Sequence, residues 1–166
     1  YISYLDANNL YGWAMVQPLP EGDFRWEAER DADKLIAQYA DNPERGCFVK
    51  CDIHYPEELH DSHNDYPLAP ERKLVTQEML SPYASELQQQ LKIGKDVSEK
   101  LVPNLQDKTN YVVDIRNLKF YRDHGLKITK VSNVISFKQS TWMKPYIEFN
   151  TEMRKKAKND FEKDFY

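Results

Sequence analysis

The residues best placed to do chemistry lie near the start of the chain. Residues 1–6 alternate in side-chain direction and predict a β-strand, with the carboxylate of Asp6 at the point where the apolar run ends. Two asparagines then break the pattern, which indicates a tight turn with free backbone groups. A carboxylate beside such a turn suits a divalent cation held against a phosphate, because hard cations prefer oxygen ligands. The alternative is that Asp6 only caps a turn after a core strand.

The same stretch carries a family resemblance. The pattern Asp-x-x-x-Leu-Tyr after an apolar strand, here residues 6–11, resembles motif A of the family B DNA polymerases. The longer form Leu-Asp-Ala-Asn-Asn-Leu-Tyr-Gly-Trp-Ala-Met resembles their protein-primed branch, which includes certain bacteriophages, adenoviruses, linear organellar plasmids and Polinton-type mobile elements. Other segments are also similar to that branch, namely residues 56–60, 64–71, 116–121, 125–127 and 137–138, so the likeness extends over most of the chain.

The resemblance implies a role for each residue of this motif. Asp6 would be the catalytic metal ligand that bridges two Mg²⁺ ions, and Ala7 would add its main-chain carbonyl to one of them. Asn9, Leu10 and Tyr11 would turn backbone amides toward the triphosphate of the incoming nucleotide. The ring of Tyr11 would lie beneath the deoxyribose and exclude a 2′-hydroxyl. The alternative for Tyr11 is a core aromatic beside Leu10.

Two positions depart from the commonest family pattern. Asn9 stands where Ser is usual, and Gly12 stands where Pro is usual. The first change is mild, since the backbone of the turn would contact the triphosphate. The second makes the turn less rigid, because glycine leaves the backbone unconstrained.

The last part of the chain, from about Thr141, predicts one amphipathic helix. At 100° per residue its apolar side chains fall on one arc. They are Trp142, Tyr146, Phe149, Met153, Ala157, Phe161 and Phe165. By position, the resemblance assigns Lys155 and Lys163 on the other side to the incoming triphosphate and the template strand. The alternative is a solvated face on which Glu152 and Lys156 form a pair worth only ~0.2–0.5 kcal/mol.

Charge is divided unevenly along the 166 residues, whose net charge is −4. The net charge of residues 1–83 is −9, and that of residues 84–166 is +5. The second half is therefore expected to face a polyanion. The alternative is that its lysines are ordinary solvated side chains. No apolar run approaches the ~20 residues of a membrane helix, and no signal peptide is predicted. A chain that starts within a strand and stops within a basic helix is expected to be a fragment.

Two cysteines lie on one predicted strand, residues 47–54. Cys47 and Cys51 share an apolar face with Val49 and Ile53, which predicts buried free thiols in a reducing compartment. A disulfide between them would have to span ~13 Å, which is beyond its reach.

The polar segment 56–73 predicts a loop with two weak metal hypotheses. The spacing of the cysteines to His60 and His63 fits no common zinc site. Asp61, His63 and Asp65 could form a metal cluster, but a solvated turn is the favoured interpretation.

The remaining patterns predict an α+β fold. Helices are expected at 31–40, 81–94, 117–124 and in an extra turn at 96–102, strands at 111–115 and 126–137, and a turn or short extended link at 17–22. The resemblance implies part of a polymerase palm with an inserted α/β subdomain. Residues 1–20 would be the palm strand and motif A turn, 21–110 the insertion that meets the priming protein, and 111–166 the return to the palm.

The function expected from this resemblance is DNA-directed DNA polymerisation initiated on a protein primer. The expected partners are a DNA template and primer, dNTPs, Mg²⁺ and a terminal priming protein, with no membrane. Motif B, a lysine followed by Asn-Ser-x-Tyr-Gly, does not occur in the chain, and no Asp-Thr-Asp or similar triplet of motif C follows a predicted strand, so the chain is expected to be inactive alone. One alternative is a degenerate or domesticated mobile-element fragment that acts only as a nucleic-acid or protein binding module. Another is a metal-dependent nuclease built on Asp6 and the acids of residues 52–65.

Overall fold

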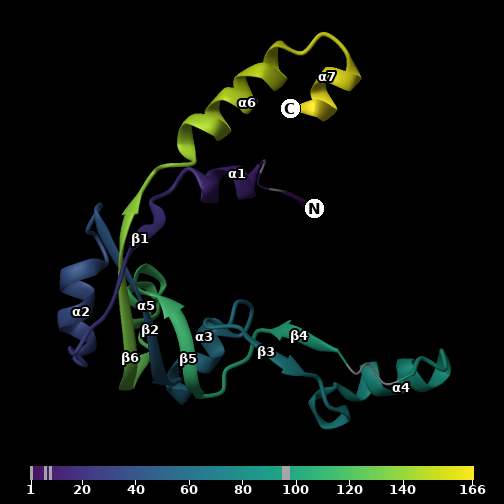
Figure 1. Cartoon of the computed structure of the whole chain (residues 1–166). Helices are drawn as coiled ribbons and strands as arrows, with labels where there is room; N and C mark the ends of the chain where they lie inside the picture. The colour runs from purple at the N-terminus through teal and green to yellow at the C-terminus, as the bar shows by residue number, and fades with distance from the viewer. Residues whose placement is uncertain (1, 6, 8, 95–97) are drawn as a thin grey trace. The chain divides into compact units, whose positions relative to one another are not determined.

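The chain folds into helices and antiparallel sheets, which confirms the predicted α+β class (Figure 1). The computed structural model describes residues 2–5, 7, 9–94 and 98–166. In chain order the helices and strands are α1 (Leu10–Met15), β1 (Leu19–Trp26), α2 (Ala32–Tyr39), β2 (Arg45–His54), the 3₁₀ turn Glu57–Leu59, α3 (His60–His63), β3 (Glu71–Leu74), the 3₁₀ turn Gln77–Met79, α4 (Pro82–Gln90), β4 (Glu99–Val102), β5 (Lys108–Asp114), α5 (Ile115–Asp123), β6 (Lys127–Ser140), α6 (Lys144–Lys156) and α7 (Asp160–Phe165).

One sheet has the strand order β1-β6-β2-β5, and a second pairs β3 with β4. The chain divides into two compact units. The first consists of Tyr1–Lys50, Val112–Lys119 and Val131–Tyr166, and the second of Cys51–Tyr111 and Phe120–Lys130. The functional division at residues 20 and 110, which came from the resemblance, stays a prediction.

The apolar face of β2 is buried as its alternation predicts. Cys47, Val49, Cys51 and Ile53 are each at most 2% exposed, and both cysteines are free thiols. Burial raises the pKa of each thiol to about 12. Helix α2 is confirmed too, because Asp31 caps it by accepting hydrogen bonds from the amides of residues 33 and 34. Its Leu35, Ile36 and Tyr39 are buried in the first unit.

The second unit contains a buried cation. Lys108 has a fully buried side chain, and its Nζ lies 3.4 Å from a carboxylate oxygen of Glu71 and donates to Asn104. Desolvation lowers the pKa of Lys108. Desolvation opposes the ionisation of Glu71, but hydrogen bonds from Asn104 and Lys73 and the charge of Lys108 outweigh it and lower its pKa. This pair joins β3 to the start of β5.

Several expectations about local structure are wrong. Residues 2–5 form no strand, and Ile2, Tyr4 and Leu5 are each at least 88% exposed. No strand of the described chain pairs with them, and a strand without a neighbour forms no inter-strand hydrogen bonds. Residues 19–26 form strand β1, which agrees with the extended alternative for residues 17–22 and continues beyond it. Because β1 is an edge strand, Pro20 is tolerated there despite its missing amide.

Two segments that pair with each other were also predicted wrongly. Residues 99–102 were expected to be helical and residues 71–73 to lie in a loop, but they pair as β4 and β3. Glu71 lies opposite Val102, and Leu74 lies opposite Glu99. The loop segment also holds the short helix α3. Pairing between segments far apart in sequence overrode the local signals here.

The predicted helices 81–94 and 117–124 are present with shifted ends. Ser81 caps α4 by accepting from the amide of Ala84 at 3.1 Å, as expected, but the helix stops before Lys92, which has a φ of 52°. Helix α5 ends as predicted at Gly125, whose φ is 95°. Strands β5 and β6 confirm the two predicted strands, each extended by three residues at one end.

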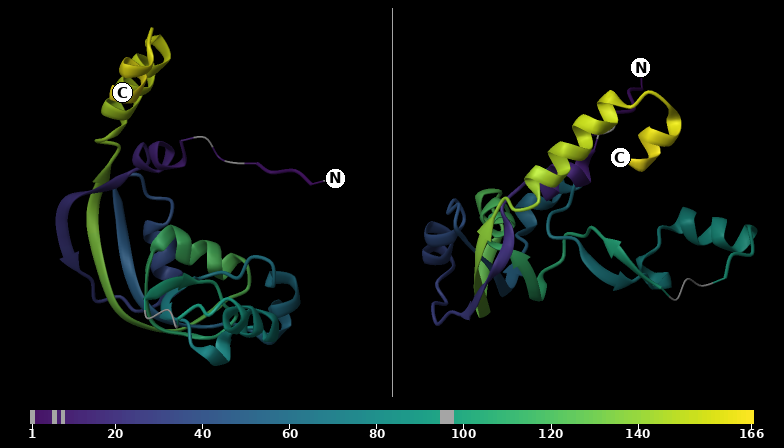
Figure 2. Two further views of the ribbon diagram at one scale, coloured as in Figure 1. Left: turned by 90° about the vertical axis from the view of Figure 1, so that its right-hand side faces the viewer. Right: turned by 45° about the horizontal axis from the view of Figure 1, so that its top comes forward.

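The final helix is broken, whereas one continuous helix was expected. Helix α6 ends at Lys156, and α7 turns back along it from Asp160 (Figure 2). Asn159 causes the break by capping α7, since its side chain accepts from the amide of Glu162 at 2.9 Å. The Glu162 carboxylate in turn accepts from the amide of Lys158, the residue before the cap, at 2.7 Å, an arrangement related to the capping box. The spacing Asn-x-x-Glu was the missed sequence signal.

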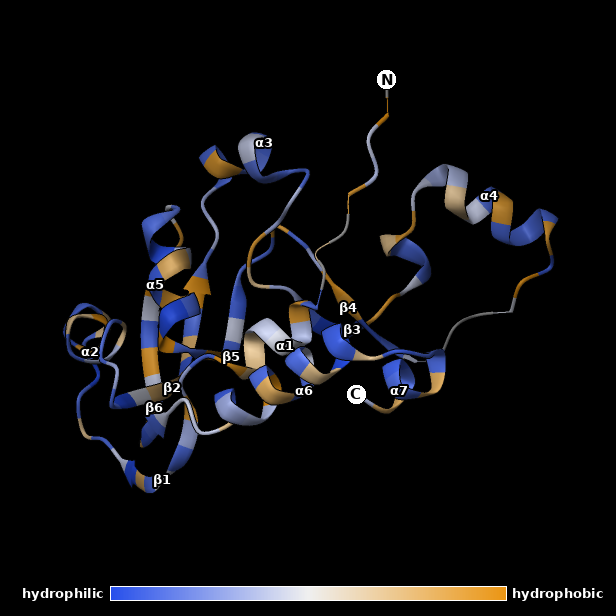
Figure 3. Cartoon of the chain, turned by 90° about the horizontal axis from the view of Figure 1, so that it is seen from above, coloured by the Kyte–Doolittle hydropathy of each residue, from blue (hydrophilic) through white to orange (hydrophobic). Residues whose placement is uncertain are grey.

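Apolar side chains remain exposed on several helices. Figure 3 shows orange residues among blue ones along α4 and α6, and neither helix buries a residue fully. Within the described part of the chain, no helix is long and apolar enough to cross a membrane.

Candidate functional site

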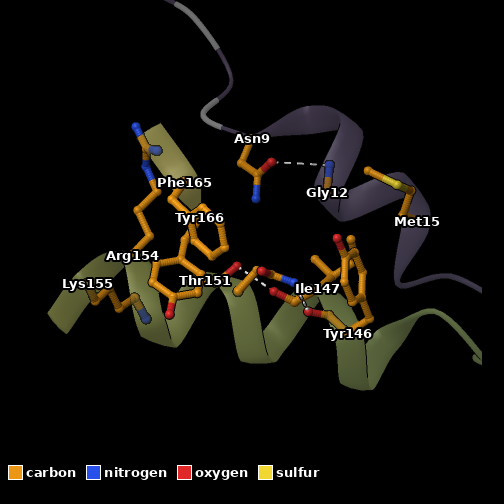
Figure 4. A pocket seen from close by; sticks show the side chains of 11 residues that line it. Asn9, Gly12, Met15, Tyr146, Ile147, Thr151, Arg154, Lys155, Phe165 and Tyr166 are labelled. Atoms are coloured by element: carbon orange, nitrogen blue, oxygen red, sulfur yellow. Dashed lines mark hydrogen bonds between the residues drawn. The ribbon is translucent and has the colours of Figure 1, made fainter. Parts of the chain in front are cut away.

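A pocket of about 680 Å³ lies between α1 and α6, within the first unit (Figure 4). Helix α1 contributes Gly12 and Met15, with Asn9 as its cap. The other lining residues come from α6 and the end of the chain: Tyr146, Ile147, Asn150, Thr151, Arg154, Lys155, Phe165 and Tyr166. The pocket thus combines amide and hydroxyl groups, two cations and three aromatic rings.

The wall formed by α1 depends on Asn9. This residue has a φ of 54° and a ψ of 45°, the left-handed region that asparagine tolerates better than most residues. Its Oδ1 accepts a hydrogen bond of 3.2 Å from the amide of Gly12. A Cβ at position 12 would lie 2.6 Å from Cγ of Asn9, so glycine is needed for the asparagine side chain to fold over the first turn.

The other motif residues that the structure describes lie on the surface. Tyr11 is 86% exposed and Leu10 is 58% exposed, so Tyr11 is not a core aromatic. Ala7 is also exposed, and Asp6 lies outside the described residues. The expected roles of Asp6, Ala7, Leu10 and Tyr11 therefore stay predictions.

The wall formed by α6 comes from three adjacent pairs spaced four residues apart, at 146–147, 150–151 and 154–155. That spacing places them on one helix face. The amide of Asn150 donates to the carbonyl of Tyr146 at 2.8 Å, and the hydroxyl of Thr151 donates to that of Ile147 at 2.8 Å. The sequence analysis missed Tyr146, Asn150 and Thr151 as pocket residues, although this spacing could have revealed them.

The two predicted lysines have different surroundings. Lys155 lines the pocket and lies 3.3 Å from a carboxylate oxygen of Glu152. Lys163, on α7, is not a lining residue, and its Nζ lies 3.4 Å from Asp160. Its main-chain oxygen accepts a hydrogen bond from Arg154, which ties α7 to α6. Arg154 is therefore a pocket cation that the sequence analysis did not identify.

A second hollow of about 550 Å³ shares Asn9, Gly12 and Lys155 with the first. Glu148 and Glu152 line it, so its charge is mixed. The anion-binding capacity of the site is thus greatest near Arg154 and Lys155, on the side where α7 returns. A guanidinium and an ammonium on adjacent residues can bind phosphate oxygens by bidentate and single hydrogen bonds respectively.

The polar segment of the second unit offers no comparable site. His63 Nδ1 lies 2.8 Å from the hydroxyl of Tyr55, which also accepts from the amide of Leu68. Asp61 and Asp65 are exposed. Among the residues that the structure describes, no three His, Cys, Asp or Glu side chains gather as a metal site.

Comparison of the chain with protein-family models, with curated proteins and with solved structures gave no match.

Proposed function

We propose that this chain is part of the palm and inserted subdomain of a protein-primed family B DNA polymerase, which adds dNTPs to a primer 3′-hydroxyl. The proposal begins from the motif Asp-x-x-x-Leu-Tyr at residues 6–11. The observation that carries it further is that Asn9 and Lys155, far apart in sequence and both expected to contact the nucleotide, line the same pocket.

The composition of the pocket also supports a nucleotide as ligand. Arg154 and Lys155 supply positive charge for a triphosphate, and Tyr146 supplies an aromatic surface. Tyr11 is exposed on α1, where its ring would be available to a sugar. A volume of about 680 Å³ falls within the ~300–1,000 Å³ typical of small-molecule sites.

The catalytic roles follow from the donor chemistry of the motif. The carboxylate of Asp6 and the main-chain carbonyl of Ala7 are the oxygen ligands that Mg²⁺ prefers. Bound magnesium would lower the pKa of the primer hydroxyl and neutralise the leaving pyrophosphate. The chain's own residues would hold the triphosphate and exclude ribonucleotides.

Steady-state kinetics of the full-length polymerase test the pocket. Lys155→Ala should raise KM for the dNTP roughly tenfold or more, because a charge-assisted hydrogen bond to phosphate is worth ~1.5–3 kcal/mol. Thermal stability should stay nearly constant, since the side chain is 68% exposed.

Lys156→Ala provides the matched control. Lys156 is the next residue of α6 and is exposed, but it lines neither hollow. Lys156→Ala should leave KM for the dNTP within about twofold of the value for the unsubstituted enzyme, because the charge that it removes lies outside the pocket. Equal effects of the two substitutions would mean that α6 presents only a general basic surface, and the nucleotide site would lose its support.

A further inference from the structure

One face of the four-stranded sheet is open and carries a small apolar hollow. Its volume is about 280 Å³, and all four strands of the sheet contribute to it within the first unit. The lining residues are Trp26, Phe48, Lys50, Val112, Asn133 and Ile135. Trp26 is 72% exposed and Val112 is 65% exposed, so the sheet presents apolar surface directly to solvent.

The aromatic groups of this face are held in place by the fold. The ring of Phe48 packs against Phe137, with ring centroids 4.9 Å apart, and Phe137 is fully buried. Phe24 packs against the same buried ring at 6.1 Å. Trp26 lies opposite Ile135 in the β1–β6 pairing, which puts their side chains next to each other on one face. A ligand would therefore meet a surface whose geometry is already set.

The charge of the hollow narrows the choice of ligand. Lys50 is the one charged residue among the six, and its side chain forms no hydrogen bond or ion pair within the described residues. A purely apolar segment covering the hollow would bury this ammonium without a partner, at a large cost in free energy. A nucleotide brings both a flat ring for Trp26 and Phe48 and a phosphate for Lys50.

We propose that this sheet face binds single-stranded nucleic acid. Bases stack on Trp26 and Phe48, Lys50 pairs with a phosphate, and the exposed amide of Asn133 is placed to reach a base edge. The volume of the hollow, about 280 Å³, is just below the ~300–1,000 Å³ range of ligand pockets, so the hollow holds one ring at a time along a strand. This surface is separate from the pocket between α1 and α6 and does not depend on nucleotidyl transfer.

Fluorescence anisotropy with a labelled 12-nucleotide oligo(dT) tests the proposal on the chain in the absence of dNTP. Trp26→Ala should weaken binding about 5- to 150-fold, which corresponds to the loss of one base stack. Lys50→Gln should weaken binding as well and reduce the slope of log K against log salt by about 0.7, the value for one phosphate contact on a single strand. Circular dichroism checks that both variants fold.

Trp142→Ala is the control, because Trp142 is also an exposed tryptophan of the first unit, 56% accessible, but does not line the hollow. The Trp142→Ala variant should bind oligo(dT) as tightly as the unsubstituted chain does. Lys156→Ala, which removes a charge of α6 that lines neither hollow between α1 and α6, should likewise leave oligo(dT) binding intact. The proposal is overturned if oligo(dT) does not bind, or if Trp26→Ala and Trp142→Ala have equal effects, or if an apolar peptide binds the face while oligo(dT) does not.

Discussion

The amide of Gly12 donates a hydrogen bond of 3.2 Å to Oδ1 of Asn9. These are the two positions at which the motif departs from the pattern of the family that it resembles, where Ser and Pro are usual. Proline has no amide hydrogen to donate, so the asparagine cap requires a residue other than proline at position 12. A Cβ at position 12 would also clash with the side chain of Asn9, so the residue at each of these two positions depends on the residue at the other.

The hydrogen bond between Asn9 and Gly12 predicts that the effects of substituting these two residues on the stability of α1 are not additive. Asn9→Ala should destabilise α1 by about 1 kcal/mol through loss of the cap. In a Gly12→Pro background the same substitution should cost less, because the hydrogen-bond donor is already absent. Exchange of the Val16 amide, which donates to the carbonyl of residue 12, measures the local opening of the helix. Additive effects would show that the hydrogen bond contributes nothing to α1.

A carboxylate at position 6 is the central requirement of the proposed chemistry. Asp6→Asn should abolish nucleotide addition by the full-length polymerase, because the loss of a ligand charge removes several kcal/mol of transition-state stabilisation. DNA binding and thermal stability should change little. Asp61→Asn, at an exposed acid of the second unit, should be silent. Primer extension by Asp6→Asn within tenfold of the unsubstituted enzyme would contradict the assignment of motif A.

The exposure of Tyr11 makes its substitution a clean test of sugar selection. Tyr11→Val should raise ribonucleotide incorporation relative to deoxynucleotide incorporation, because the volume of the ring is the proposed filter. The free energy of unfolding should change by no more than ~0.5 kcal/mol, since the side chain is 86% exposed. An unchanged incorporation ratio would leave Tyr11 without a role in selecting the sugar.

Glu71 should be important for stability because it neutralises a buried ammonium. Glu71→Gln should lower the free energy of unfolding by up to ~3–5 kcal/mol, measured by urea denaturation at neutral pH. Glu58→Gln is the control, because the pair of Glu58 with Lys127 is exposed. Equal effects of the two substitutions would contradict a special role for Glu71.

The destabilisation caused by Glu71→Gln should depend on pH, because the pKa values of Lys108 and Glu71 are both shifted in the folded chain. The pKa of Lys108 is lowered in the folded chain, so the unfolded chain binds more protons between that value and 10.5, and stability rises with pH there. Neutral Lys108 does not need the carboxylate, so the difference between Glu71→Gln and the unsubstituted chain should narrow as pH rises toward 10.5. The pKa of Glu71 is also lowered, and the stability it contributes is lost as pH falls from 4.5 through its folded-state pKa. The difference should therefore narrow at acid pH as well.

Both cysteines should be chemically inert in the folded chain. Burial raises the pKa of Cys47 and Cys51 to about 12, so almost no thiolate is present at pH 8. A thiol reagent such as 5,5′-dithiobis(2-nitrobenzoate) should label neither residue until urea unfolds the protein, and then should label both. Rapid labelling of the native chain would contradict this burial.

The parts of the fold that are decided locally could be predicted from the sequence. Asp31 and Ser81 cap the helices that they were expected to cap, and Cys47 alternates with its buried neighbours as its strand pattern indicates. These features depend on residues a few positions apart. Strand β4 could not be predicted, because its structure comes from pairing with β3, some 28 residues earlier.

The candidate site could be predicted only in part, for the same reason. Asn9 and Lys155 were identified from the motif and its position in the chain, but nothing local indicated that they share a pocket. Lys163 was placed on the same helix as Lys155, since a regular helical period was assumed through Asn159. Arg154 was overlooked because its hydrogen bond to residue 163 exists only once that helix is broken.

The cap at Asn159 determines where the pocket ends, because α7 turns back there and Phe165 and Tyr166 then line the pocket. An unbroken helix rises ~1.5 Å per residue and would carry Phe165 about 12 Å beyond Ala157 along the axis of α6. The aromatic end of the chain would then leave the pocket, and a groove open at that end would remain between α1 and α6. Such a groove accommodates an extended strand, whereas the closed form accommodates a compact ligand. One amide and one carboxylate, those of Asn159 and Glu162, thus decide the shape of molecule that this site can hold.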